Sequence, residues 1–88
     1  MTRIVRSIRE PMVTVDGDIY TVHVYGRQRE DGLWEGWIEF ASADGPVLRT
    51  GAETTQPKLV DLEYWASGLS PVYCEGALQR ARDGEPTG

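Results

Sequence analysis

The chain has 88 residues, 40% of them hydrophobic, with nine Lys and Arg against 14 Asp and Glu. This length fits one small domain and excludes two. A formal net charge of −5 argues against nucleic-acid binding by the domain as a whole, and a single cysteine excludes an internal disulfide. No apolar run of about 18 residues and no apolar secretory core near Met1 is present, so we expect a cytoplasmic protein without membrane contact.

The basic residues are unevenly placed. Arg3, Arg6 and Arg9 lie in the first nine residues without any acid, which leaves six basic against 14 acidic groups in residues 10–88. One interpretation is a basic arm that contacts nucleic acid. The simpler interpretation is an edge strand or frayed terminus, in which these charges flank Ile4, Val5 and Ile8 and block unwanted strand pairing.

Residues 12–50 alternate with the period of strands that have one buried face. Asp16 and Gly17 suit a tight hairpin turn, so we expect strands at residues 11–15 and 18–28. In the second of these strands, one face carries Tyr20, Val22 and Val24. The opposite face carries Ile19, Thr21, His23, Tyr25 and Arg27.

The third expected strand covers residues 33–41 and has the clearest alternation. Trp34, Gly36, Ile38 and Phe40 form its core face, and Glu35, Trp37 and Glu39 form the opposite face. A turn at residues 43–46 leads into a short strand at 47–50. The first half of the chain is therefore predicted to be an antiparallel meander of three or four strands.

The period changes to three and four after Gly51, which predicts two helices. Leu59, Leu62, Ala66 and Leu69 form the first apolar stripe, with Thr55 or Gln56 as the cap and Gly68 as a left-handed end. Ser70 and Pro71 begin the second helix, whose stripe is Cys74, Ala77, Leu78 and Ala81. Gly84 ends it, and residues 84–88 are expected to form a disordered tail.

Strands followed by helices indicate a single α+β domain over residues 1–83, with a basic segment at 1–9 and two helices packed on one sheet face. The other sheet face is then uncovered. We expect a partner-binding surface there, formed by His23, Tyr25, Glu35, Trp37 and Glu39, with Trp37 exposed to solvent. Glu35 and Glu39 would repel RNA. The alternatives are that Trp37 only covers strand backbone, or that the register slips by one residue.

Other candidate sites are weaker. Cys74 and His23 are the candidates for nucleophilic or redox chemistry, but a cysteine on an apolar stripe is more often a small buried hydrophobe. The Asp16 to Asp18 turn lacks the further ligands of a calcium loop, so we expect no metal and no other cofactor. An alternative ligand site consists of Glu53, Thr54, Thr55, Gln56 and Tyr64, although these residues also suit the start of a helix.

Two resemblances follow from particular segments. YTVHVYG, a turn ending in DG, LWEGWIEFA and the following helix resemble the strand-rich domain of HicB-type antitoxins over residues 18–66. The segments ETTQP, YWASGL and PVYCEGAL resemble a group of short uncharacterised bacterial proteins. The first resemblance implies a non-catalytic acidic domain that pairs with itself or with a basic partner. Those antitoxins often carry a DNA-binding segment after the domain, where this chain has a short helix.

We therefore expect a non-catalytic bacterial domain that works by protein association, as a homodimer or with a basic protein partner. The alternative is an enzyme or small-molecule-binding domain with a site near the start of the first helix. A third possibility is nucleic-acid binding through Arg3, Arg6 and Arg9.

Overall fold

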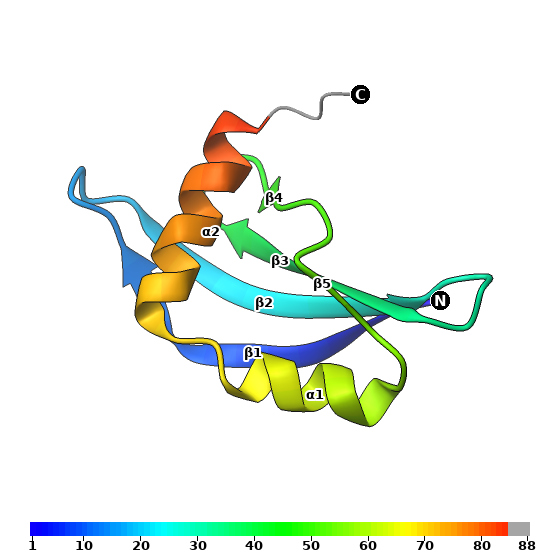
Figure 1. The fold of residues 1–88 in the computed structure, drawn as a ribbon. Coiled ribbons are helices and arrows are strands. Elements are labelled where there is room, and N and C mark those ends of the chain that lie inside the picture. Colours follow the sequence, from blue (N-terminus) through cyan, green and yellow to red (C-terminus); the bar gives the residue numbers. More distant parts are fainter. Residues whose placement is uncertain (85–88) are drawn as a thin grey trace.

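The computed structural model describes residues 1–84 and confirms the predicted α+β fold (Figure 1). The strands are β1 (Thr2–Val13), β2 (Ile19–Gln28), β3 (Trp34–Ala41), β4 (Leu48–Arg49) and β5 (Thr54–Gln56), followed by helices α1 (Leu59–Ser67) and α2 (Pro71–Asp83). Apart from Gly84, the expected tail at 84–88 lies outside the described residues. None of the helices in residues 1–84 is both long and apolar enough to cross a membrane.

The first strand is longer than expected. β1 begins at Thr2 rather than at residue 11, so the basic segment 1–9 forms an edge strand paired with β2. The pairing register shifts between Ile4 and Arg6 and again between Ile8 and Met12. These bulges interrupt the period-two pattern, which is why alternation did not reveal the strand. A turn does lie at Asp16 and Gly17, and Gly17 has a φ of +90°. The tight two-residue turn is wrong, because β1 ends at Val13 and β2 begins at Ile19.

β2 and β3 form the centre of the sheet. Their antiparallel ladder runs without interruption from Thr21 opposite Ala41 to Gln28 opposite Trp34. Both strands therefore keep the faces that the alternation predicted, because a slip of one residue would exchange the faces.

The outer edge of β3 pairs with two short strands rather than one. β4 pairs with Glu39 and Phe40, and β5 pairs with the first three residues of β3. Between them, the backbone amide of Ile38 donates to the Thr50 hydroxyl at 3.1 Å, and the amide of Glu53 donates to the Gly36 carbonyl at 2.8 Å. The expectation that Thr54–Gln56 lead directly into a helix is wrong, because these residues complete the sheet.

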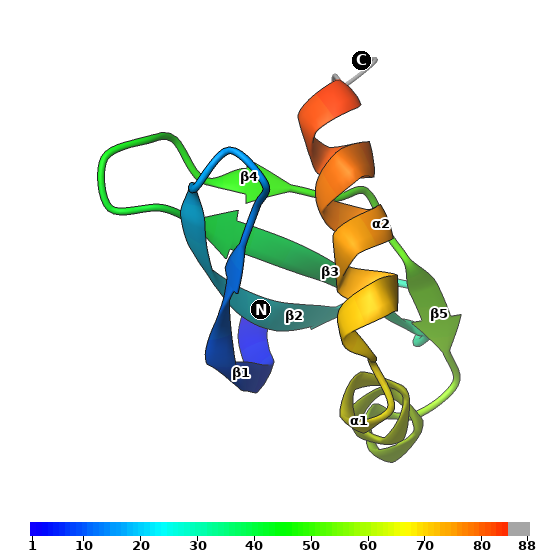
Figure 2. The same ribbon diagram turned by 90° about the vertical axis from the view of Figure 1, so that its left-hand side faces the viewer.

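The two helices pack on one side of the sheet (Figure 2). Their buried stripe meets the core face of the central strands. Leu62 is fully buried over Gly26 and Gly36, which lie opposite one another in the ladder. The buried core consists of Tyr20, Val22, Val24, Ile38, Phe40, Ala66, Cys74, Ala77, Leu78 and Ala81.

The helix ends agree with the sequence in part. The hydroxyl of Ser70 accepts a hydrogen bond from the Tyr73 amide at 3.1 Å, as expected of a cap at the start of α2. α1 instead begins after Lys58 and has no side-chain cap. Gly68 ends α1 with a φ of −94°, so the predicted left-handed conformation is wrong.

Candidate functional site

The sheet face opposite the helices brings together the five predicted partner-binding residues. Tyr25 on β2 lies opposite Trp37 on β3, and His23 lies opposite Glu39. Glu35 lies opposite Arg27 at the end of the ladder near the β2–β3 turn. Successive side chains alternate between faces, so this register places all five on the uncovered side.

Trp37 lies on the predicted face but is buried, with 3% of its surface exposed. The expectation of an exposed indole is therefore wrong. The Tyr25 ring stacks against the indole with 6.1 Å between ring centroids and 14° between the planes. From β4, the Arg49 guanidinium lies 4.4 Å from the centroid of the indole. We call this arrangement the Tyr25–Trp37–Arg49 stack.

Two further contacts fix the Tyr25–Trp37–Arg49 stack. The indole Nε1 donates to Oε2 of Glu39 at 3.1 Å, so the buried polar atom of Trp37 has a partner. The Arg27 guanidinium lies 6.0 Å from the indole centroid and donates to Glu35 at 2.5 Å. Cation–π attraction and hydrogen bonding thus hold the indole against its own sheet.

The charges on this face balance. Arg27 and Arg49 stand beside Glu35 and Glu39, whereas the whole chain has a net charge of −5. Sequence reasoning placed Arg27 on the face without assigning it to the site, and it missed Arg49. The predicted strand at 47–50 carried the available signal, because its pairing with β3 puts Arg49 opposite Glu39.

Two apolar side chains border the face. Ile4 lies opposite Tyr25 and is 53% exposed, and Ile19 is 57% exposed at the start of β2. Near them, Nδ1 of His23 is 3.0 Å from the hydroxyl of Ser7. The His23 ring lies edge-on to Tyr25 with 6.4 Å between centroids. His23 therefore belongs to the same surface as the aromatic stack.

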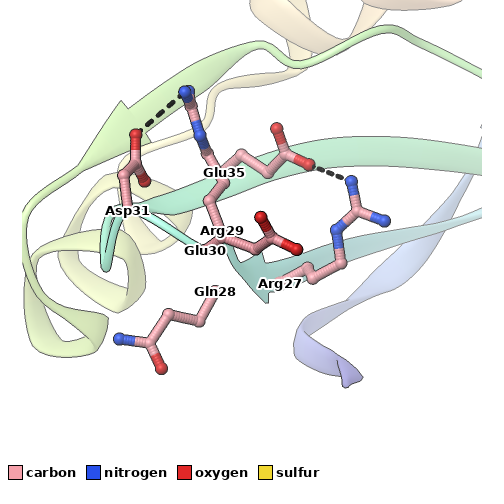
Figure 3. Close-up of a pocket in the computed structure, with 6 residues that line it drawn as sticks. All are labelled: Arg27, Gln28, Arg29, Glu30, Asp31 and Glu35. Atoms are coloured by element: carbon pink, nitrogen blue, oxygen red, sulfur yellow. Dashed lines mark hydrogen bonds and ion pairs between the residues drawn. The ribbon is translucent and has the colours of Figure 1, made fainter.

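A depression of about 590 Å³ lies at the β2–β3 turn, beside the Arg27 end of the face (Figure 3). Its arginines already hold carboxylates, Arg27 on Glu35 and Arg29 on Asp31. These pairs are visible as dashed lines in the close-up. Exposed pairs of this kind contribute little, and their charges compensate one another within the depression.

The alternative ligand site does not assemble as predicted. Glu53 has a side chain only 10% exposed, which accepts hydrogen bonds from the Tyr73 hydroxyl at 2.6 Å and from Arg80 at 2.5 Å. Thr54, Thr55 and Gln56 pair with β3. Tyr64 is 81% exposed and lines a cavity with residues of the α1–α2 turn, not with β5. Glu53 thus ties the start of β5 to α2.

The contact between Glu53 and Tyr73 makes the free energy of unfolding depend on pH in the alkaline range. Burial, the hydrogen bond to Glu53 and the charge of Glu53 raise the pKa of Tyr73 from 10.0 to about 12. The unfolded chain then loses this proton first, so the free energy of unfolding falls as pH rises between these two values. Tyr73→Phe should flatten this fall, whereas Tyr64→Phe, at an exposed tyrosine, should not. Urea denaturation across this range checks the slopes, and equal slopes in both variants would contradict the assignment.

The other candidate residues from the sequence pack in the core or form part of a turn. Cys74 is buried, as the simpler interpretation predicted, and burial raises the pKa of its thiol. Asp18 closes the hairpin turn through its carbonyl and lies 3.4 Å from Arg82. Within residues 1–84, no cluster of three or more His, Cys, Asp or Glu side chains could hold a metal ion.

Comparison with known proteins identified no relative: no family model, no curated protein and no solved structure matches the chain.

Proposed function

We propose that this chain is a non-catalytic association domain whose uncovered sheet face binds a second copy of the chain. The Tyr25–Trp37–Arg49 stack at the centre of that face is the observation that carries the proposal. Interface hot spots are enriched in Tyr and Arg, and Tyr25 and Arg49 are the members of the stack that reach the surface, with Trp37 as their buried support. Because the rings are already stacked, binding costs little additional side-chain entropy.

The charge of the face favours a second copy over a basic partner. Two arginines and two glutamates make it neutral, so two acidic chains can approach through it without strong repulsion. In the proposed dimer a twofold axis can set the arginines of one copy against the glutamates of the other. A basic partner, as in the antitoxin-like alternative, is better served by an acidic face.

Exposed apolar groups add to the argument. Ile4 and Ile19 lie at the border of the face, more than half exposed. Burial of such side chains at an interface is worth roughly 25 cal/mol for each Å² of apolar surface removed from water. Isoleucines beside a charged and aromatic centre give the face an apolar area that an interface would bury.

Sedimentation of the wild type and two tyrosine variants tests the proposal. The wild type should sediment as a dimer at micromolar concentration. Tyr25→Asp should weaken the dimer at least about thirtyfold, because loss of a hot spot costs about 2 kcal/mol or more. Tyr64→Asp places the same charge on α1 and should leave the dimer intact, since Tyr64 is on the helical side.

A second variant separates association from folding. Ile4→Lys changes a half-exposed side chain outside the stack, so its melting temperature should stay near that of the wild type while the dimer weakens. A monomeric wild type at millimolar concentration would overturn the proposal. If that monomer bound a lysine-rich peptide and Glu35→Gln/Glu39→Gln abolished the binding, the face would serve a basic partner instead.

A further inference from the structure

β1 is an accessible edge of the sheet. It pairs with β2 on one side only, and none of its 12 residues is buried (Figure 2). An edge of this length presents a row of backbone N–H and C=O groups that can pair with another strand. Natural proteins use such edges to bind extended peptides, because backbone pairing supplies affinity and neighbouring pockets supply specificity.

A groove of about 370 Å³ runs beside this edge, between β1 and the α1–α2 turn. Ile8 and Met12 from β1 and Val22 from β2 supply apolar lining on its β-strand side. Charged residues of β1 line the same side. The helical side contributes Leu69, Pro71 and Cys74. The groove can therefore take apolar side chains from a strand that lies along β1.

The cations of β1 have no carboxylate partner among the described residues. Within residues 1–84, Arg3, Arg6 and Arg9 form no ion pair, although other arginines of the chain do. Arg6 is half-buried and donates to the carbonyl of Ala66 at 2.7 Å, which fixes its guanidinium beside the groove. Arg9 also lines the groove, next to the exposed acid Glu10. Unpaired guanidinium groups at this edge favour carboxylates in a ligand.

The bulge in β1 falls at the groove. Ile8 is paired with Val22 and Met12 with Tyr20, so residues 9–11 stand opposite the single residue Thr21. Backbone groups of these three residues therefore stand outside the regular ladder. Bulges often occur next to binding sites, where they redirect side chains and end strand pairing.

We infer that the edge of β1 binds an extended acidic segment of a partner protein as an added strand. The segment pairs with the β1 backbone, places apolar side chains in the groove and sets carboxylates against Arg3, Arg6 and Arg9. An antiparallel pair of two β1 strands centred on Arg6 puts Arg3 against Arg9 and Arg6 against itself, which disfavours a second copy in that register. The added strand lies on the edge of β1, so this inference does not rest on the self-association proposed for the uncovered face.

A synthetic peptide tests this inference on the full chain. The probe is a capped octapeptide in which pairs of valines alternate with pairs of glutamates, so either side of the extended peptide carries both residue types. We expect the probe to shift the backbone amide signals of residues 2–13 in ¹⁵N-edited NMR spectra. A probe with lysines in place of the glutamates should not bind, and neither should one with N-methylated backbone amides.

Matched double variants test the arginines. Arg3→Gln/Arg9→Gln should weaken the peptide about tenfold, since it removes two exposed charge pairs each worth up to about 1 kcal/mol. Arg29→Gln/Arg82→Gln removes the same charge elsewhere and should change the affinity less than twofold. Arg6 is kept because it also bonds Ala66. Both double variants should sediment as the wild-type dimer does.

Three results would overturn the inference. The first is absence of binding by the valine–glutamate probe at millimolar concentration. The second is equal binding of the N-methylated probe, which would exclude strand addition. The third is an equal loss of affinity in both double variants, which would show that only the overall charge matters.

Discussion

Gly36→Ala should lower the free energy of unfolding by about 1–3 kcal/mol, a large cost for one added methyl group. A Cβ at this position would lie 2.7 Å from Cδ1 of Leu62 and 3.3 Å from Cγ2 of Thr54. Leu62 is fully buried, so it cannot move away into solvent. Gly26, the cross-strand neighbour, is equally tight, since its Cβ would lie 2.5 Å from Cδ2 of Leu62.

A double-mutant cycle tests whether position 36 requires glycine because Leu62 packs against it. Leu62→Ala alone should cost about 2–5 kcal/mol, because it leaves a cavity under α1. In the Leu62→Ala/Gly36→Ala double variant, the loss of unfolding free energy should be smaller than the sum of the two single losses by at least about 0.5 kcal/mol. The added methyl group then fills space that the leucine vacated.

Urea denaturation followed by circular dichroism measures all the variants. Gly51→Ala is the matched control, because a Cβ there would meet nothing within 4 Å, and its stability should differ little from the wild type. Additive losses for Gly36→Ala and Leu62→Ala would mean that the two residues do not share the space we assign to them.

Trp37→Ala should lower the free energy of unfolding by about 3–5 kcal/mol, although the residue lies on the face without helices. The indole is 3% exposed and stacked on Tyr25, and Glu39 accepts its N–H. Truncation would leave Tyr25 and Arg49 without their shared neighbour. Thermal and urea denaturation check this expectation, against a loss within about 0.5 kcal/mol for Tyr64→Ala on the surface of α1.

The cost of truncating Trp37 affects the choice of association variants. A protein that loses stability at Trp37 would lose its dimer for that reason alone. Tyr25→Asp leaves the indole in place, and Ile4→Lys acts outside the Tyr25–Trp37–Arg49 stack, so these variants separate the two effects better. A near-native stability for Trp37→Ala would show instead that the indole is loosely held and that Arg49 does not cover it.

The central strands could be predicted in detail because their pattern is regular. Asp16 and Gly17 mark the turn before β2, and alternation over β2 and β3 assigns each side chain to a face. Since one face must bury Val22, Val24 and Ile38, only one assignment of faces satisfies the pattern. The helical stripe with Leu62 and Ala66 was predictable for the same reason, with a different period.

Irregular pairing hid the rest of the sheet. In β1 the two bulges break the alternation of Ile4 and Ile8, so Arg3, Arg6 and Arg9 suited a basic arm as well as the edge strand that the structure shows. In β5 the sequence around Thr54 and Thr55 is polar, because an edge strand three residues long buries little. Its pairing with β3 depends on a partner far along the chain, which local patterns do not report.

Alternation also assigned Trp37 to a face without revealing its exposure. Period two distinguishes the sides of a sheet, but the cover over a side chain comes from neighbours on other strands. Arg49 supplies that cover from a strand of only two residues. Arg49 has a long side chain, lies opposite Glu39 and is one strand away from the indole. A residue in such a position can cover an indole on the neighbouring strand.

The divided outer edge of β3 limits how the molecule can polymerise. On that side, Thr50 and Glu53 occupy the gap between β4 and β5, so no continuous row of free backbone groups is left for another chain. β4 and β5 are only two and three residues long, so the longest open edge within residues 1–84 is β1, on the opposite side of the sheet. A fibril that grows by strand pairing needs two long open edges on every subunit, and residues 1–84 offer one.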